Sequence, residues 1–230
     1  WTTAYDESLQ VYDSNTIRLN EPEGRTTYFG RLIGSSGALL PLEADFRGQL
    51  TQIAGGYTLS LKDGSSHQFD STGRLVSLTD RNGNQTTLTY NVSGKLSSVT
   101  DPFGRVLTFV FNGDRVSQIS DTTGVIADYT YSNVTGSNQK LLTVTYADAS
   151  GYSFVYDASH RLTTVKDKLN NVLEAHAYDS QSRATSSEVQ GGVERYTLTY
   201  VSATETDVTD ALGHVTKYFF DTTKARNVVT

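Results

Sequence analysis

An aromatic residue returns along this chain at nearly constant intervals, and no other feature of the sequence constrains the fold as much. Intervals of 20 to 25 residues separate the anchors, which are Phe69, Tyr90, Phe111, Tyr131, Tyr156, Tyr178, Tyr200 and Phe220. A period of this length indicates a supersecondary repeat that packs against its neighbours, because one such repeat is too short to bury a core by itself.

The segment before each anchor alternates between two kinds of residue. Tyr152, Phe154 and Tyr156, for example, fall on one face of an extended segment, whereas Ser153 and Val155 fall on the other. A period of two predicts a half-buried strand with an aromatic face and a face rich in Thr and Ser.

Two turns complete each repeat. An Asp or Asn after most anchors can accept a hydrogen bond from the backbone N–H two residues on, which opens a first turn. Ten or eleven residues after most anchors, Asp-x-x-Gly predicts a second turn, as at residues 80–83. The chain then reverses twice per repeat and builds an antiparallel strip. In the intervening strand, Leu75 and Leu78 are three residues apart, so we expect a β-bulge there.

The regular repeats occupy only part of the chain. Residues 1–56 carry degenerate lead-in repeats of the same domain, and residues 57–230 form a strip of repeats about 21 to 22 residues long. Lys62-Asp63-Gly64-Ser65 predicts a hairpin with a two-residue loop. The expected fold class is all-β: one continuous domain with a repetitive antiparallel β-sheet strip, curled or spiralled.

Composition excludes several classes of function. The net charge of the 230 residues is −6 and the Lys and Arg residues are scattered singly, so we expect no nucleic-acid partner. The absence of Cys excludes disulfides and thiolate chemistry. No apolar run approaches the roughly 18 residues of a membrane span. Because the chain has no Met and starts at Trp1, we expect it not to be a complete reading frame.

Two stretches resemble a known repeat. Residues 69–83 and residues 156–167 are similar to the tyrosine-aspartate (YD) repeat of the Rhs family. Its pattern is Tyr-Asp, two variable residues, Gly-Arg-Leu, two more, Val-Thr-Asp, two more, then Gly. Phe69 replaces the Tyr in the first stretch, and His160 replaces the Gly in the second. The resemblance covers residues 57–230 well and residues 1–56 weakly.

The resemblance implies an architecture. Rhs proteins, the shell components of bacterial toxin complexes and animal teneurins wind a long β-sheet strip into a spiral or hollow barrel. In the bacterial toxins the shell encloses a C-terminal toxic domain, which a self-cleaving segment near the end of the shell releases. We find no such segment in this sequence. Residues 101–104 are similar to its Asp-Pro-x-Gly element but lie in register with the other second turns, which favours a turn.

We expect no catalytic, cofactor-binding or metal-binding residues and no cofactor. The histidines do not pair at a metal-ligand spacing; they are His67, His160, His176 and His214. Residues 80–84 alternate oxygen side chains as calcium loops do, yet Gln85 stands where such a loop needs Gly and Asn91 where it needs a bidentate acid. Carboxylates recur in nearly every repeat, which assigns them to turns rather than to an acid–base pair.

The sequence leaves three functions open. The first is a non-enzymatic structural segment of a secreted or cell-surface bacterial protein, forming part of a β-shell, stalk or filament. Its partners would be adjacent repeats or other copies, met through sheet edges, and an enclosed toxin domain. The second is an adhesin or carbohydrate-binding module whose exposed aromatic rings face a glycan. The third and minor function is the protease or toxin portion itself. The expected location is extracellular or on the cell surface.

Overall fold

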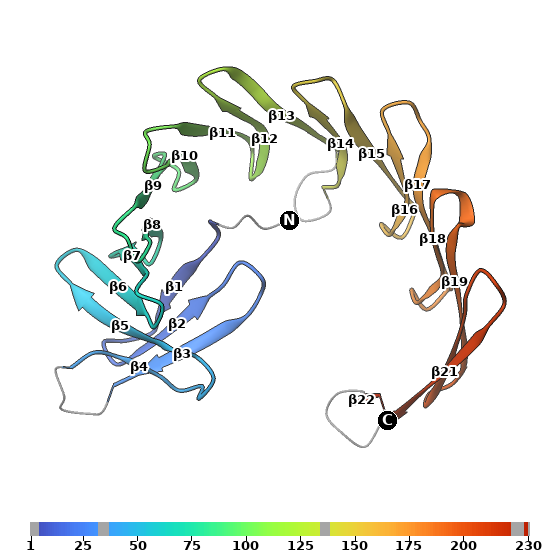
Figure 1. Ribbon diagram of the computed structural model, residues 1–230, viewed down its shortest axis with the longest axis horizontal. Helices are drawn as coiled ribbons and strands as arrows, with labels where there is room; N and C mark the ends of the chain where they lie inside the picture. The colour runs from blue at the N-terminus through green and yellow to red at the C-terminus, as the bar shows by residue number, and fades with distance from the viewer. Residues whose placement is uncertain (1–4, 32–36, 134–138, 222–227, 230) are drawn as a thin grey trace. The chain divides into compact units, whose positions relative to one another are not determined.

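The computed structural model describes residues 5–31, 37–133, 139–221 and 228–229, and these residues form strands joined by tight turns (Figure 1). Apart from a 3₁₀ turn at Gln190–Gly192, none of the described residues is helical. The expected all-β class is therefore confirmed. In this part of the chain no helix has the length and hydropathy needed to cross a membrane.

The chain divides into two compact units, residues 1–110 with 120–123 and residues 111–119 with 124–230. The strands of the first unit are β1 (Ser8–Val11), β2 (Thr16–Asn20), β3 (Thr26–Gly30), β4 (Leu40–Pro41), β5 (Gly48–Ile53), β6 (Gly56–Leu61), β7 (Ser66–Asp70), β8 (Leu75–Thr79), β9 (Gln85–Tyr90) and β10 (Leu96–Thr100). Two strands contribute residues to both units, namely β11 (Val106–Asn112) and β12 (Arg115–Asp121).

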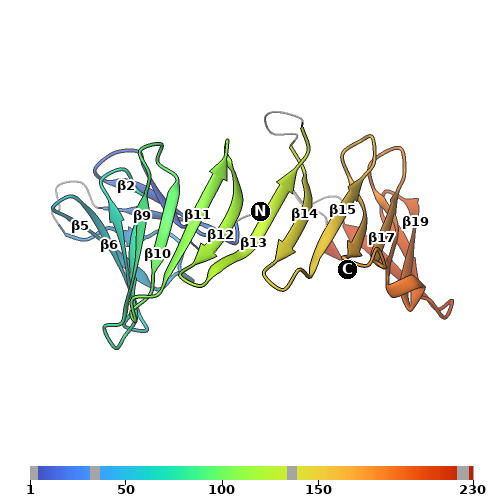
Figure 2. The same ribbon diagram turned by 90° about the horizontal axis from the view of Figure 1, so that it is seen from above.

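The remaining strands belong to the second unit. They are β13 (Gly124–Tyr131), β14 (Leu141–Tyr146), β15 (Gly151–Tyr156), β16 (Leu162–Asp167), β17 (Val172–Tyr178), β18 (Ala184–Val189), β19 (Glu194–Ser202), β20 (Glu205–Thr209), β21 (Val215–Asp221) and β22 (Val228–Val229). Each strand from β13 to β21 pairs antiparallel with the next, so the described part of this unit is a strip one sheet thick (Figure 2).

The first unit has a second layer. Strands β1 to β4 pair in sequence order as a separate antiparallel sheet, whereas β5 to β10 each pair with the next strand of the strip. Both sheets supply side chains to one core, which includes Ile17, Leu19, Phe29, Leu39, Leu50, Leu59, Phe69 and Leu75, each at most 2% exposed. Burial of this apolar surface is the main stabilising term for the unit.

A backbone contact fixes the β1–β4 sheet to the strip. The Leu9 N–H donates to the Gly73 carbonyl at 2.7 Å. A Cβ on Gly73 would lie 2.1 Å from the Leu9 carbonyl oxygen, and Gly73 has a φ of +84°. Glycine is therefore required here twice, for the turn and for the close approach of β1.

Strand registers confirm the predicted alternation. On one face Val144 pairs with Tyr152, and Phe154 pairs with Val165; on the other, Thr143 pairs with Ser153. The expected bulge is confirmed as well. Gln68 pairs with Ser77 and Phe69 with Leu75, which leaves one extra residue, Val76, on β8. Equivalent register shifts follow the first turns in β10, β16 and β18.

The regular first and second turns share one backbone geometry. In a first turn, the Asp157 N–H donates to Arg161 O and the His160 N–H donates to Asp157 O, both at 3.0 Å. In a second turn, Asp167 pairs with Asn171 in the same way. The loop thus has three residues and ends on a left-handed residue, which is a type I turn with a G1 bulge.

The two-residue loop predicted for residues 62–65 was wrong. The Leu61 N–H donates to Ser65 O and the Gly64 N–H donates to Leu61 O, so three residues form this loop too. A two-residue type I′ turn requires a positive φ at both central residues. Only Gly64 has one, with a φ of +89°, and the Asp63 carboxylate instead accepts the Ser65 N–H at 3.0 Å.

Candidate functional site

A carboxylate at the start of most regular turns holds the loop closed. Asp70 Oδ1 accepts the backbone N–H groups of Thr72 and Arg74 at 2.9 and 3.0 Å, and Oδ2 accepts Arg74 Nε at 2.8 Å. Partial burial alone would raise the pKa of Asp70, but the hydrogen bonds from Thr72 and Arg74 outweigh it and hold that pKa below its usual value.

The same pairing recurs along the chain. Two further first turns repeat the carboxylate–guanidinium pair, Asp157 with Arg161 and Asp179 with Arg183, at 2.7 and 2.8 Å. In the second turns the donor four residues on varies in type, as in the pairs Asp80–Asn84, Asp101–Arg105, Asp167–Asn171 and Asp210–His214. The turn carboxylates are therefore committed to backbone and side-chain hydrogen bonds.

The first-turn arginine also contacts the next repeat. Its guanidinium carbon lies 4.9 Å from the ring centre of Tyr90 for Arg74, 4.8 Å from that of Tyr178 for Arg161, and 4.0 Å from that of Tyr200 for Arg183. A guanidinium at this distance over a ring makes a cation–π contact worth roughly 0.5–1 kcal/mol at an exposed site. Each pair joins one repeat to the following anchor.

The hydroxyl of the anchor Tyr makes a second contact with the preceding repeat. The Tyr90 O–H donates to the Leu75 carbonyl at 2.7 Å, and the Tyr178 O–H donates to the Leu162 carbonyl at 2.8 Å. The same bond runs from Tyr131 to Val116 and from Tyr200 to Ala184. Burial raises the pKa of Tyr90 and of Tyr131.

Three contacts join four groups in an arrangement that we call the latch: the turn Asp, the Arg four residues on, the next anchor Tyr, and the carbonyl of the residue after the Arg. It is complete at Asp70–Arg74–Tyr90–Leu75, Asp157–Arg161–Tyr178–Leu162 and Asp179–Arg183–Tyr200–Ala184. In the second unit, whose described part has no second layer, the latches at Asp157 and Asp179 add polar contacts between neighbouring repeats.

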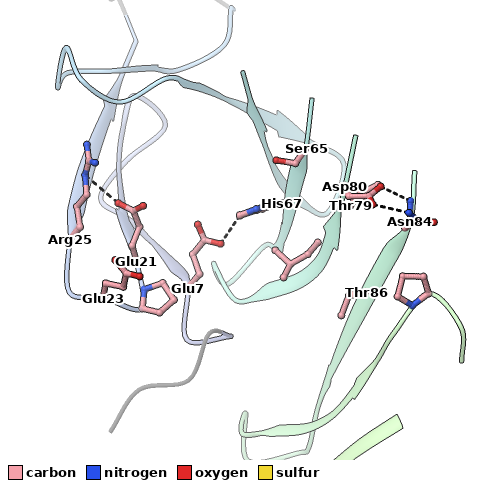
Figure 3. Close-up of a pocket in the computed structure, with 13 residues that line it drawn as sticks. Glu7, Glu21, Glu23, Arg25, Ser65, His67, Thr79, Asp80, Asn84 and Thr86 are labelled. Carbon is pink, nitrogen blue, oxygen red and sulfur yellow. Dashed lines mark hydrogen bonds and ion pairs between the residues drawn. The ribbon is translucent and has the colours of Figure 1, made fainter. Parts of the chain in front are cut away.

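A cavity of about 890 Å³ lies in the first unit, between the β1–β4 sheet and the strip (Figure 3). Glu7 is 8% exposed, and its Oε2 makes a hydrogen bond with His67 Nδ1 at 2.6 Å. Glu21 lines the same cavity, and burial raises its pKa despite the ion pair with Arg25 at 3.5 Å. The Glu7–His67 pair joins the two layers, so its part in the structure is the same as that of the Leu9–Gly73 contact.

The histidines take separate places. His160 holds a left-handed turn position with a φ of +70°, and His214 bonds the turn carboxylate of Asp210 at 2.9 Å. His176 contacts Ser187 at 3.1 Å. Among the described residues, no group of three or more His, Cys, Asp or Glu side chains is arranged to hold a metal ion. The absence of catalytic and cofactor residues stays a prediction.

Sequence reasoning missed the latch arginines. It also gave no sign that the hydroxyls of four anchor tyrosines donate to backbone carbonyls of the preceding repeat; these are Tyr90, Tyr131, Tyr178 and Tyr200. Two sequence spacings could have revealed the latch arginines. In these three repeats an Arg stands four residues after the turn Asp, and the next anchor Tyr stands 16 or 17 residues after that Arg. Strand register alone brings that Tyr over the Arg.

An antiparallel strip whose hairpins are fastened one to the next by a recurring polar contact defines a β-hairpin repeat protein. The RHS Repeat family model matches residues 69–110, which contain the first complete latch repeat. The resemblance to the Rhs family is thereby confirmed over this stretch of the chain. A comparison with curated proteins gave no match.

Solved structures share the fold over nearly the whole chain. The crystal structure of TcdB2-TccC3 without the hypervariable C-terminal region superposes with a TM-score of 0.56 at 15% identity, covering 99% of this chain and 15% of that one. A Tc holotoxin pore of Photorhabdus luminescens with a substitution in TccC3 gives 0.55 at 15% identity, with the same coverage. The TcdB2-TccC3-Cdc42 crystal structure gives 0.50 at 14% identity, covering 96% and 16%. This chain thus spans about 15% of the length of these chains.

Proposed function

We propose that this chain is a non-enzymatic wall segment of a secreted or cell-surface protein, and that its parent forms a shell around a toxin domain. The observation that supports the proposal is the latch, because the same contact occurs with the same geometry in three repeats, at Arg74, Arg161 and Arg183. A wall needs uniform fastening, whereas an enzyme needs one site that differs from the rest of the surface.

The chemistry of the turn carboxylates supports the same function. Their hydrogen bonds hold the pKa values of Asp157 and Asp179 below the usual range, chiefly through the backbone N–H groups of Arg161 and Arg183. A general acid needs a raised pKa, so these carboxylates are poor proton donors at neutral pH. They suit permanent turn closure.

Electron microscopy of the purified parent protein tests the shell directly. We expect hollow particles with density inside, and removal of the enclosed domain should empty the particles without changing their outline. Solid stalks, filaments or compact globules would contradict the shell. Substituting Arg74, Arg161 and Arg183 with Ala should lower the yield of closed particles, since each change removes one latch.

A carbohydrate-binding function is the alternative that one observation favours. Tyr146 and Tyr152 are about 40% exposed and pack edge to face with ring centres 6.2 Å apart. Exposed rings of this kind can stack on sugars. A glycan array on the chain and on its Tyr152→Ala variant decides: binding that the substitution abolishes supports the alternative, and an array without signal removes it.

A further inference from the structure

The cavity of the first unit is acidic on both of its sides. Its lining includes four carboxylates, three from the side of the β1–β4 sheet and one from the strip: Glu7, Glu21, Glu23 and Asp80. The one guanidinium in the lining belongs to Arg25, so these groups leave an excess of negative charge while His67 is neutral. A space of this size, about 890 Å³, is large enough for a small organic molecule.

Glu7 brings an unused acceptor to this cavity. Its side chain is 9% exposed, and its Oε2 is taken by His67 Nδ1 at 2.6 Å. Its Oε1 has no hydrogen-bond partner in the described part of the chain, and Glu7 points into the space between the two layers (Figure 3). A carboxylate withdrawn from water is costly unless donors meet its oxygens. The geometry of Glu7 therefore favours a donor that comes from outside the chain.

His67 adds a second acceptor. An ionised carboxylate can only accept, so the Nδ1 of His67 carries the proton of the bond to Glu7, and a neutral imidazole then has its lone pair on Nε2. No described residue makes a hydrogen bond to that Nε2. The dyad thus offers the cavity acceptors and no free donor.

The other polar side chains of the lining are already engaged. Asp80 Oδ2 accepts Asn84 Nδ2 at 2.7 Å, and the Ser65 hydroxyl donates to Asp63 at 2.6 Å. Burial raises the pKa of Glu21, and the neighbouring carboxylates of Glu7 and Glu23 act in the same direction. A bound cation would relieve this repulsion between like charges.

The acceptors of the cavity suit an extended organic cation better than a metal ion. A metal ion needs its ligands gathered around one point, and the described residues contain no group of three or more acidic or His side chains arranged in that way. Apolar side chains lie between the charged ones, namely Leu78, Pro22 and Pro102. Methylene groups pack on such a surface, and each ammonium group at the ends of a chain of methylenes carries three donors.

We propose that this cavity binds a small aliphatic polyamine. The ammonium groups donate to Glu7, Glu23 and His67, and the methylene chain packs on Leu78. Because Glu7 and Glu23 belong to one layer and His67 to the other, the bound polyamine joins the β1–β4 sheet to the strip.

Calorimetric titration of the chain with spermidine at about 0.15 M salt tests the site. We expect saturable binding of one molecule per chain. Glu7→Gln and Glu23→Gln should each weaken it about tenfold, since each removes a charge-assisted hydrogen bond. Glu23 is exposed, so this variant should fold as the parent chain does. The matched control is Glu194→Gln, which removes the same charge from an exposed place in the second unit and should bind normally.

Absence of saturable binding, or a loss in Glu194→Gln as large as in Glu23→Gln, would overturn the proposal. Magnesium chloride at matched ionic strength separates a site from general screening of charge. If it displaces spermidine as well as a second polyamine does, the cavity is only a region of negative potential and the proposal fails.

Stability gives an independent readout. A ligand that binds only the folded state raises the free energy of unfolding, so spermidine should raise the urea midpoint of the parent chain. Glu7→Gln has its own midpoint without ligand, and spermidine should leave that midpoint almost unchanged even if the substitution itself weakens the contact between the layers. An increase in Glu7→Gln equal to that of the parent chain would place the polyamine elsewhere.

Discussion

Thr27 is a polar residue in an apolar environment. Its side chain is fully buried in the core face of β3, where its neighbour across the strand pair is Leu19, and its Oγ1 has no hydrogen-bond partner among the described residues. A buried hydroxyl without a partner costs roughly 1–3 kcal/mol of desolvation. The residue therefore lowers the stability of the first unit.

Thr27→Val should raise the free energy of unfolding by about 1 kcal/mol, because it replaces the unpaired hydroxyl by a methyl group of the same shape. The urea midpoint measured by circular dichroism checks this. The matched control is Thr72→Val, whose hydroxyl bonds Asp70 at 2.7 Å and whose loss should lower the midpoint. A Thr27→Val midpoint at or below that of the parent chain would contradict the prediction.

His160 shows the cost of a side chain at a left-handed position. Its φ is +70°, in a turn place that Gly73 and Gly94 fill in other first turns. For an L-residue with a Cβ, this conformation costs roughly 1–2 kcal/mol, part of which the greater unfolded-state entropy of glycine offsets.

His160→Gly should accordingly stabilise the chain by about 0.5–1 kcal/mol in thermal or urea unfolding. Asn170, with a φ of +66°, provides the comparison: asparagine tolerates the left-handed region, so Asn170→Gly should gain less. If His160→Gly raises the free energy of unfolding no more than Asn170→Gly does, the left-handed backbone of His160 is not strained.

At the scale of the element, the hairpin depends on its neighbour. A single hairpin is marginally stable in water, and the described part of the second unit has no second layer to bury its apolar face. The latch compensates, since it ties each first turn to the following anchor through a charged pair, a ring contact and a hydrogen bond to a backbone carbonyl.

Tyr178→Phe should lower the free energy of unfolding by about 1 kcal/mol, because the Leu162 carbonyl loses its donor. Arg161→Ala should cost a similar amount, and a double-mutant cycle of Arg161→Ala with Tyr178→Leu, which removes the ring, should give a coupling of about 0.5–1 kcal/mol from the ring contact. Tyr152→Phe is the control: its hydroxyl bonds none of the described residues, so the stability should be almost unchanged. A coupling energy near zero would show that the Arg161–Tyr178 contact contributes nothing.

At the scale of the whole molecule, the turn carboxylates make stability depend on pH. Hydrogen bonds hold the pKa values of several of them below the model-peptide value, including Asp80, Asp167 and Asp210. A carboxyl whose pKa is lower in the folded than in the unfolded state contributes stability above its unfolded pKa of about 3.9. That stability is lost as pH falls through the folded value.

We therefore expect the urea midpoint to be flat from pH 7 to about 5 and to fall steeply below about pH 4. Replacing Asp80, Asp167 and Asp210 by Asn should lower the midpoint at pH 7 and flatten its acid dependence, since fewer carboxylates remain to be protonated. An Asn variant with the full acid dependence of the parent chain would place the titrating groups elsewhere.

The sequence by itself determined the strip. The period of the anchors, the alternation around Phe154, the turn residues and the bulge beside Val76 follow from side-chain spacing and backbone φ preferences, which are local and legible in one repeat. The tertiary structure alone decided which contacts join one repeat to another and one sheet to the other. It laid the Arg161 guanidinium over Tyr178 and docked Leu9 on Gly73. Those contacts join residues 16 or more positions apart, and their geometry depends on strand register and twist, which no single repeat specifies.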